Sequence, residues 1–257
     1  PVLVPTDLIC SPPSEGMLRH VDTNGLASGN TALEALVHGL CEVIERDTIS
    51  QHEFRALYGD PADERPPSAV VDPKSVGGPA AAWIERVRDH GLDLVVHDIT
   101  GDIQIATFRA IVIDPVFPTP NGPTATCFPG FGTHPNAHVA VLRAVTEAIQ
   151  SRLAAIQGAR DAFNEFSHGP RRAAGVERAR DVACAPAREF AATVSRCNID
   201  LRDDLRDLLD ALRRAGFEQV IGVDLTKPDL NLPVVRVRVP GLSSFVVNRR
   251  RVGDRVL

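Results

Sequence analysis

The stretch WIERVRDHGLDLVVHDITGDIQIATFRAIVIDP, residues 83–115, decides the expected fold because a similar stretch occurs a second time. The counterpart is LLDALRRAGFEQVIGVDLTKPDLNLPVVRVRVP, residues 208–240. Each begins with the apolar spacing of an amphipathic helix, and a glycine then predicts the helix end, Gly91 in the first and Gly216 in the second.

Two strands are expected after each glycine. The first ends in Asp-Ile-Thr in one stretch and in Asp-Leu-Thr in the other, and the second alternates over 103–113 and 231–239. A helix followed by strands is common in proteins that mix both elements, so this order alone is not specific. The shared Asp-x-Thr and the matching order favour an internal duplication.

A long helix is expected upstream of each repeated stretch, at 31–51 and at 136–154. A glycine-rich loop precedes each helix, NGLASGN at 24–30 and PGFGTHP at 129–135. Linkers are expected at 60–78 and 167–204. The sequence therefore predicts an α/β (α+β) fold of duplicated helix-strand-strand units, with pseudo-repeat halves at about 20–115 and 125–242.

Composition narrows the class of protein. The 257 residues are 44% hydrophobic and 24% charged, as in ordinary globular proteins, and the net charge of -5 argues against a dedicated nucleic-acid binder. We find no apolar run of about 18 residues, so no membrane-spanning helix is expected, and we find no signal peptide. Five cysteines without a CxxC pair indicate reduced thiols in a cytoplasmic protein rather than a zinc site.

The first long helix carries an acidic face. At 100° per residue, five polar side chains share an arc of about 120°, while most of the remaining circle is apolar or small. Like charges three and four residues apart repel each other, so a positive partner is expected opposite, and Mg²⁺ with phosphate fits that demand. The five residues are Asn30, Glu34, His38, Glu42 and Glu45.

Simpler interpretations stay open for several of these residues. Thr31 and Glu34 have the spacing of a capping box, which would account for Glu34 alone. Arg46 has the spacing to pair with Glu42 on the same helix. His38 is the weakest member, because a single histidine on a helix is more often a packed or surface residue than a ligand.

The second long helix repeats the arrangement with other residues. Arg143, Glu147 and Gln150 share one face, and Arg152 follows. Aligning Glu147 with Glu42 places Gln150 against Glu45, so the two helices would flank a nucleotide, with carboxylates on the metal and guanidinium groups on phosphate. The alternative is an ordinary surface pair between Arg143 and Glu147. The expected apolar face is Val139, Leu142, Val145 and Ile149.

Three stretches resemble the YcaO family. They are NGLASGNTALEALVHGLCEVIERDT at 24–48, GFGTHPNAHVAVLRAVTEAIQSRL at 130–153, and VDLTKPDLNLPVVRVRVPGL at 223–242. The series N-G-x-A-x-G-N, E-x-x-E-R and T-E-x-x-Q-x-R stands in the family's order, and the resemblance covers residues 3–242.

The resemblance implies a YcaO-like fold and an enzyme that uses ATP and Mg²⁺ to modify a peptide backbone. Such enzymes phosphorylate an amide oxygen after a nucleophile adds to the carbonyl carbon, and phosphate then leaves. A Cys, Ser or Thr side chain gives an azoline (a cyclodehydratase reaction), external sulfide gives a thioamide, and an amine gives an amidine. The implied partner is a peptide or protein substrate.

The resemblance also implies site residues. Glu34, Glu42 and Glu45 resemble the family's magnesium ligands, and Asn30 and Arg46 resemble its phosphate or nucleotide contacts. Four residues match the later motif and are expected to bind the cofactor. They are Arg143, Glu147, Gln150 and Arg152. Since no covalent nucleophile is required, Cys41 and Cys127 are expected to be structural.

The chain departs from the family pattern in two places. Nothing before Asn24 matches the family's S-x-x-x-E-x-x-E segment, so the chain is expected to lack its N-terminal segment. The end, NRRRVGDRVL, has no proline-rich tail, which favours the thioamide-forming branch that acts beside a TfuA-like partner. A homodimer is compatible with the sequence.

The sequence lacks the motifs of two other classes of nucleotide-binding enzyme. A P-loop enzyme is excluded because G-x-x-x-x-G-K-[ST] is absent, and the absence of G-x-G-x-x-G disfavours a dinucleotide dehydrogenase. The alternative kept is a non-catalytic peptide-binding or scaffold domain with an incomplete nucleotide site.

Overall fold

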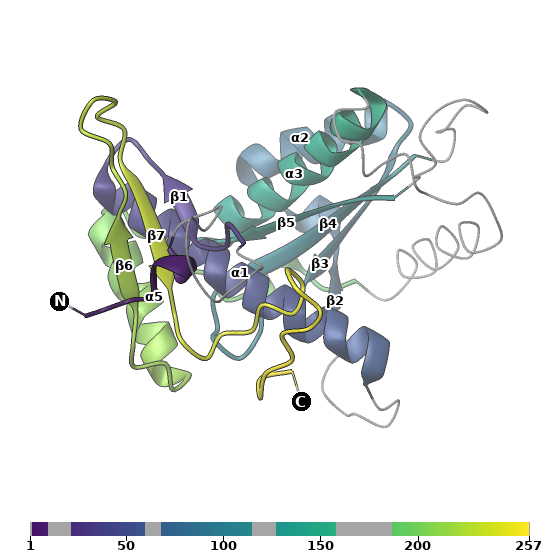
Figure 1. The fold of residues 1–257 in the computed structure, drawn as a ribbon. Coiled ribbons are helices and arrows are strands. Elements are labelled where there is room, and N and C mark those ends of the chain that lie inside the picture. The colour runs from purple at the N-terminus through teal and green to yellow at the C-terminus, as the bar shows by residue number, and fades with distance from the viewer. Residues whose placement is uncertain (1, 10–21, 60–67, 115–126, 158–186, 257) are drawn as a thin grey trace. The chain divides into compact units, whose positions relative to one another are not determined.

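The computed structural model describes residues 2–9, 22–59, 68–114, 127–157 and 187–256 (Figure 1). The chain forms two compact units. Unit 1 consists of Pro1–Asp63 with Asn198–Leu257, and unit 2 consists of Glu64–Cys197. Each unit combines helices with an antiparallel sheet.

Unit 2 is built on a sheet of order β2-β3-β4-β5, in which every neighbouring pair is antiparallel. Helices α2 and α3 lie on one face of this sheet (Figure 1) and enclose its apolar core. The strands are β2 (Ala69–Val71), β3 (Asp93–Asp98), β4 (Thr107–Ile113) and β5 (Cys127–Thr133), and the helices are α2 (Gly78–Asp89) and α3 (Ala137–Gln157).

Helix α3 lies directly on the backbone of β5. A Cβ atom at Gly130 would stand 2.1 Å from the backbone nitrogen of Ala148 and 2.3 Å from the carbonyl oxygen of Ala144. Small side chains make this approach possible, because the buried face of α3 consists mostly of alanines, whereas the predicted apolar residue Val139 is exposed. The predicted loop at 129–135 is therefore wrong, since glycine here allows helix and strand to touch.

Unit 1 has the sheet order β1-β7-β6, again antiparallel. Helix α1 packs on β1, β7 and α5, and its buried side chains include most of the predicted apolar face. Thr31 is the N-cap, and its hydroxyl oxygen accepts the Glu34 N–H at 3.1 Å, as the capping spacing predicts. The elements are β1 (Leu26–Ser28), α1 (Ala32–Tyr58), α5 (Leu201–Arg214), β6 (Ile221–Asp224) and β7 (Val234–Arg238). Short 3₁₀ turns span Thr6–Leu8, Pro73–Ser75 and Phe190–Ala192.

The repeated Asp-x-Thr forms the same turn in both units. The Thr100 N–H donates to Asp98 Oδ1 at 2.8 Å, and the Thr226 N–H donates to Asp224 Oδ1 at 2.9 Å. Each threonine hydroxyl oxygen then accepts the N–H of the first residue of the following strand, at 3.1 and 3.2 Å. The hydroxyl and the N–H of Thr226 hold the pKa of Asp224 below its usual value. The motif thus connects the two strands of each hairpin.

Both second strands begin later than the alternating pattern predicts. Gln104 has a φ of +60° and Asn231 has a φ of +47°, and a residue in this left-handed region interrupts a strand. Strands β4 and β7 therefore start only at Thr107 and Val234. Both predicted helix ends are confirmed, since α2 and α5 each stop two residues before their glycine.

The boundaries of the compact units do not coincide with the predicted halves, 20–115 and 125–242. Unit 1 joins β1 and α1 to α5, β6 and β7, whereas unit 2 joins α2, β3 and β4 to β5 and α3. Strand pairing is the reason, because β1 pairs with β7 and β4 pairs with β5. The same offset that aligns Glu42 with Glu147 also aligns the end of β1 with the end of β5. The duplication itself stays a prediction.

Parts of the predicted linkers 60–78 and 167–204 are regular structure. Strand β2 pairs with β3, and Arg188 bridges to Val71 in parallel, so these segments extend the sheet. Strand β2 was not predicted because the segment is rich in proline, and Pro73 follows the strand closely. Residues 60–67 and 167–186 of the predicted linkers lie outside the described residues, as do Cys10 and Cys184.

We expect Gly130→Ala to lower the free energy of unfolding by about 3 kcal/mol, because the new methyl group overlaps the backbone of α3. Urea denaturation measures this change. The control is Gly222→Ala in β6, where the nearest atom is the flexible end of Leu36 at 3.3 Å, and the change is expected to stay below about 1 kcal/mol. Equal losses in both variants would contradict this account of α3.

Candidate functional site

Glu42 is the acidic residue of α1 that contacts the glycine-rich stretch. Its Oε2 accepts the N–H of Gly25 at 3.2 Å, and its Oε1 lies 3.8 Å from Arg46 Nε. The glycine-rich stretch therefore contacts the acidic face directly. Arg46 thus forms the same-helix pair with Glu42 that the simpler interpretation predicts.

Glu34 takes part in the start of α1. Its carboxylate accepts the backbone N–H of Asn30 at 2.8 Å and the Asn30 side-chain amide at 3.0 Å. The capping interaction with Thr31 is formed as well. Asn30 and Glu34 therefore contact each other, as two ligands of one nucleotide would, but a helix cap explains the same contact.

Glu45 is 4% exposed, although it falls on the same helical arc as the other acids. Asp47, two residues further along α1, is completely buried and was not predicted as important. Its carboxylate accepts from Arg255 Nη2 at 2.6 Å and from the Ser243 N–H at 2.7 Å. The arginine partner stands 208 residues away in sequence, so no local pattern could have revealed this contact.

The predicted magnesium ligands fall into two groups along the helix. Glu42 and Glu45 are less than one turn apart, while Glu34 stands about 12 Å further along the axis from Glu42 at 1.5 Å per residue. Within the described ranges, no group of three or more His, Cys, Asp or Glu side chains is placed to hold one metal ion. Carboxylates suit Mg²⁺, so the donor chemistry fits, but the three glutamates do not form a single preassembled site.

The predicted residues of α3 have different surroundings. Arg143 and Glu147 are half-buried and Gln150 is exposed. Arg152 donates to Asp114 Oδ2 through Nε at 2.9 Å and through Nη2 at 2.7 Å. The Asp114 side chain is 6% exposed, so this pair ties α3 to the end of β4. Arg152 therefore has a structural partner in addition to its expected contact with the cofactor.

A second polar cluster was also missed. Asp98 Oδ2 accepts the Thr193 hydroxyl at 2.7 Å and pairs with Arg188. The Asp-x-Thr repeat had placed Asp98 at the end of a predicted strand, but its partners come from a predicted linker. The cluster fixes the segment 187–193 beside β2.

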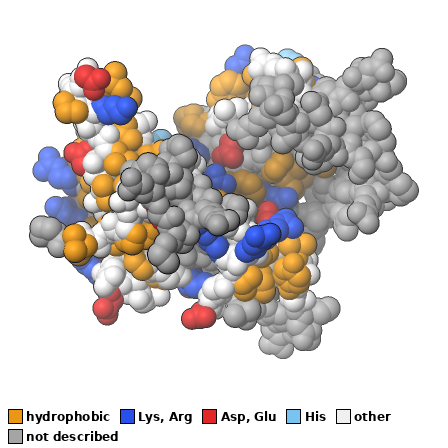
Figure 2. All heavy atoms as spheres, viewed as in Figure 1, with side chains coloured by type: hydrophobic (Ala, Val, Ile, Leu, Met, Phe, Trp, Pro, Cys, Tyr) orange, Lys and Arg blue, Asp and Glu red, His pale blue; other side chains and the backbone are white. Residues whose placement is uncertain are grey.

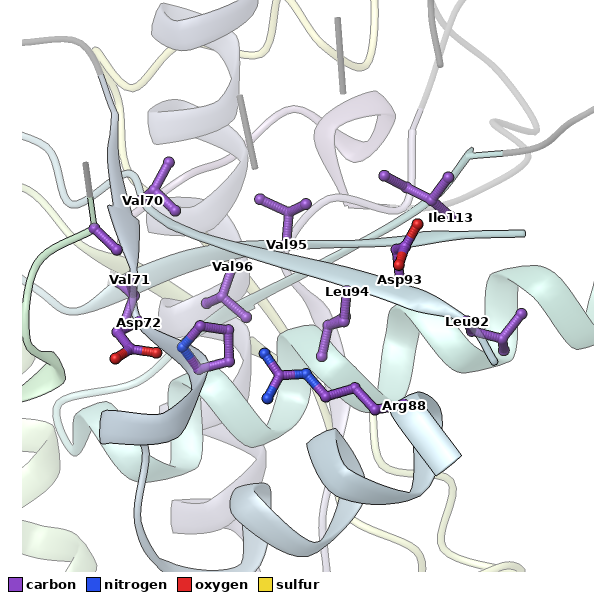
Figure 3. A pocket seen from close by; sticks show the side chains of 12 residues that line it. Val70, Val71, Asp72, Arg88, Leu92, Asp93, Leu94, Val95, Val96 and Ile113 are labelled. Atoms are coloured by element: carbon purple, nitrogen blue, oxygen red, sulfur yellow. The ribbon is translucent and has the colours of Figure 1, made fainter. Parts of the chain in front are cut away.

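Unit 2 also contains a pocket of about 490 Å³ at the end of β2. Leu94 and Val96 of β3 line it, and Arg88 reaches into it from α2 (Figure 3). None of the nine predicted cofactor-binding residues lines this pocket.

On the face drawn in Figure 2, acidic and basic side chains are interspersed with apolar ones.

The fold defines the class as α/β, and the carboxylates of the acidic helix are of the kind that binds Mg²⁺. Residues 1–243 match the model of the family described as YcaO cyclodehydratase, ATP- and Mg²⁺-binding. The chain therefore belongs to the YcaO family. The expected fold is confirmed, and the expected cofactors, ATP and Mg²⁺, are those of the family's description.

Individual relatives extend beyond this chain. An uncharacterized protein of Methanothermobacter thermautotrophicus is 37% identical over 268 residues, covering 99% of this chain and 65% of the relative. An uncharacterized protein in the tfuA 3' region of Rhizobium leguminosarum bv. trifolii is 34% identical over 225 residues, covering 86% of this chain and 52% of the relative. The chain spans about half to two thirds of the length of these curated relatives.

A solved structure shares the fold. YcaO from Methanopyrus kandleri, bound with AMPPCP and Mg²⁺, matches with a TM-score of 0.71 and 25% identity, covering 97% of this chain and 63% of that chain. In the part of our chain that the structure describes, no helix has the length and apolar character needed to cross a membrane. Among the described cysteines, Cys41, Cys127 and Cys197 form no disulfide bond.

We expect Asp114→Asn to lower the free energy of unfolding by about 2 kcal/mol, because it leaves the Arg152 guanidinium without its carboxylate. Thermal or urea denaturation measures the loss. The control is Asp203→Asn, which breaks an exposed pair with Arg206 on α5 and should change stability by less than about 0.5 kcal/mol. A stable Asp114→Asn protein would show that this pair does not hold α3.

Proposed function

We propose that this chain uses ATP and Mg²⁺ to activate a peptide amide by phosphorylating its oxygen. The observation that carries the proposal is the acidic face of α1, where Glu42 and Glu45 lie within one turn and the Gly25 N–H holds Glu42. Membership in a family described as ATP- and Mg²⁺-binding supports it. The amide oxygen is a poor leaving group, and its phosphorylation makes departure possible.

Each predicted residue has a role in this proposal. Glu42 and Glu45 would hold one magnesium ion, and Glu34 with Asn30 would bind further along the helix, so more than one ion is required. Magnesium would neutralise charge on the phosphates during transfer. The remaining predicted residues would orient the nucleotide. They are Arg46, Arg143, Glu147, Gln150 and Arg152.

The incoming nucleophile determines the product. We favour external sulfide, which adds to the amide carbon; the amide oxygen then takes the γ-phosphoryl group, ADP leaves, and loss of phosphate gives the thioamide. The relative in a tfuA 3' region supports this choice and a TfuA-like partner. A cyclodehydratase reaction, in which a substrate side chain adds instead and forms an azoline, is the second candidate, favoured by the family's description. We place the enzyme in the cytoplasm, where cysteines stay reduced; the described cysteines form no disulfide.

We expect Glu42→Gln to weaken ATP binding in the presence of Mg²⁺ at least about tenfold, because it removes a charged metal ligand but keeps the shape of the side chain. Peptide-dependent phosphate release should disappear in the same variant. Calorimetric titration with ATP, with and without Mg²⁺, measures the first effect. The matched control is Glu53→Gln on the same helix, which loses only a long pair with Arg249 at 3.8 Å.

Unchanged binding by Glu42→Gln would contradict the assignment of this ligand. If the wild-type protein binds no ATP even with Mg²⁺, the proposed function itself fails, and the non-catalytic peptide-binding or scaffold function is favoured. Mass spectrometry of a peptide treated with ATP and sulfide separates the products. A thioamide gains 16 Da by exchange of oxygen for sulfur, whereas an azoline loses 18 Da as water.

A further inference from the structure

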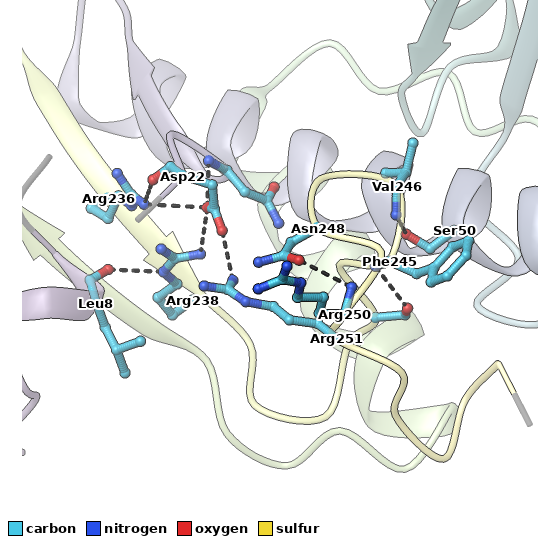
Figure 4. Close-up of polar contacts among 12 residues, drawn as sticks. Leu8, Asp22, Ser50, Arg236, Arg238, Phe245, Val246, Asn248, Arg250 and Arg251 are labelled. Carbon is cyan, nitrogen blue, oxygen red and sulfur yellow. Dashed lines mark hydrogen bonds and ion pairs between the residues drawn. The ribbon is translucent and has the colours of Figure 1, made fainter. Parts of the chain in front are cut away.

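Asp22 lies where three guanidinium groups converge in unit 1 (Figure 4). Arg251 Nη1 donates to Asp22 Oδ2 at 2.7 Å, and Arg238 Nη1 donates to Oδ1 at 3.3 Å. Arg236 Nη2 donates to the backbone carbonyl oxygen of Asp22 and lies 3.5 Å from Oδ1. Asp22 Oδ1 also accepts the Asn24 N–H at 3.0 Å. These contacts fix the chain immediately before the glycine-rich stretch.

Burial makes this anchor strong. Arg236 is completely buried in β7, and the Asp22 side chain is only 9% exposed. A buried guanidinium that loses its carboxylate keeps the cost of its lost hydration, so moving Asp22 away is unfavourable. Asp22 therefore has one well-defined position against β7.

Gly25 transmits this position to the acidic face of α1. The Val237 N–H donates to the Gly25 carbonyl oxygen at 2.7 Å, and the φ of Gly25 is +73°. A Cβ atom at this position would stand 2.1 Å from the Val237 carbonyl oxygen, so the loop can lie this close to β7 only with glycine here. From this place the Gly25 N–H donates to Glu42 Oε2 at 3.2 Å.

We propose that Asp22 is a positioning residue for Glu42. By fixing the loop to the arginines, it holds the Gly25 N–H against one carboxylate oxygen and so orients Glu42 toward magnesium. This inference rests on the proposed function for the metal, but the anchoring itself concerns only residues of this chain. Neither the acidic spacing of α1 nor the family motifs had singled out Asp22.

The first test uses Asp22→Asn, which keeps the shape of the side chain but removes its charge. We expect the magnesium concentration needed for half-maximal ATP binding to rise about tenfold, as for other residues that orient a metal ligand. Asp22→Glu keeps the charge and should recover part of the loss. The control is Asp210→Asn, which breaks an exposed pair with Arg213 on α5 and should leave magnesium dependence unchanged.

The second test needs neither metal nor nucleotide. Hydrogen exchange of the Gly25 amide in the free protein should be at least about tenfold faster in Asp22→Asn than in the wild type or in Asp210→Asn. A double-mutant cycle adds the coupling to Glu42. In a Glu42→Gln background, Asp22→Asn should have no further effect on magnesium dependence, because no carboxylate remains to be oriented.

Two results would overturn the positioning role. One is a folded Asp22→Asn protein with wild-type magnesium dependence, and the other is an effect that adds fully to that of Glu42→Gln. If Asp22→Asn does not fold, Arg251→Gln replaces it, because Arg251 is 34% exposed and gives only one of the contacts; about a threefold effect is then expected.

Failure of the proposed function is seen separately, in the wild-type protein. If the wild type shows no magnesium-dependent ATP binding, the proposed function and the role of Asp22 toward magnesium fall together. Normal wild-type binding with an unaffected Asp22→Asn protein overturns the positioning role alone.

Discussion

In unit 2 the backbone of α3 lies against the backbone of β5 so closely that one methyl group at Gly130 would overlap it. Unit 1 has a related contact, in which Gly25 lies against the backbone of Val237 in β7. Contacts of this kind leave no room for the elements to slide, because no side chain separates them. In unit 2 the height at which α3 presents its polar residues is therefore set by glycines, and in unit 1 Gly25 fixes the loop whose N–H contacts Glu42.

Buried charge is the second organising feature, and it belongs to unit 1. Asp47 and Asp22 carry none of the predicted chemistry, yet each is bound by arginines from the last part of the chain. They lie on either side of the acidic face in sequence, one just after Arg46 and the other just before the glycine-rich stretch. The helix and the loop beside the residues expected to contact magnesium are thus held by buried ion pairs that lie outside the expected site.

Local patterns predicted what local physics controls. The helix cap at Thr31 and the glycine stops depend on neighbours in sequence, and the structure has both. The Asp-x-Thr repeat predicted two strand ends, and the structure adds the turn that each one forms. Strands β1 and β5 were missed because they lie in or beside the glycine-rich stretches that were expected to be loops. Strand β1 has only three residues, and β5 contains Pro129, Gly130 and Gly132, which are depleted in strands. The acidic face followed from helical spacing alone, whereas the burial of Asp47 and the anchoring of Asp22 depend on contacts more than 190 residues apart.

Unit 1 is formed from two separate parts of the chain, and this has a consequence for synthesis on the ribosome. Unit 2 is continuous, so its sheet can close as soon as residue 197 is available, but α1 needs β7, which ends at Arg238. At about 5–20 residues per second, α1 has no β7 to pack against for several seconds after unit 2 can fold. During that interval its apolar face, including Leu40 and Ile44, is exposed to chaperones. The helix that carries the acidic face is thus synthesised early and buried late.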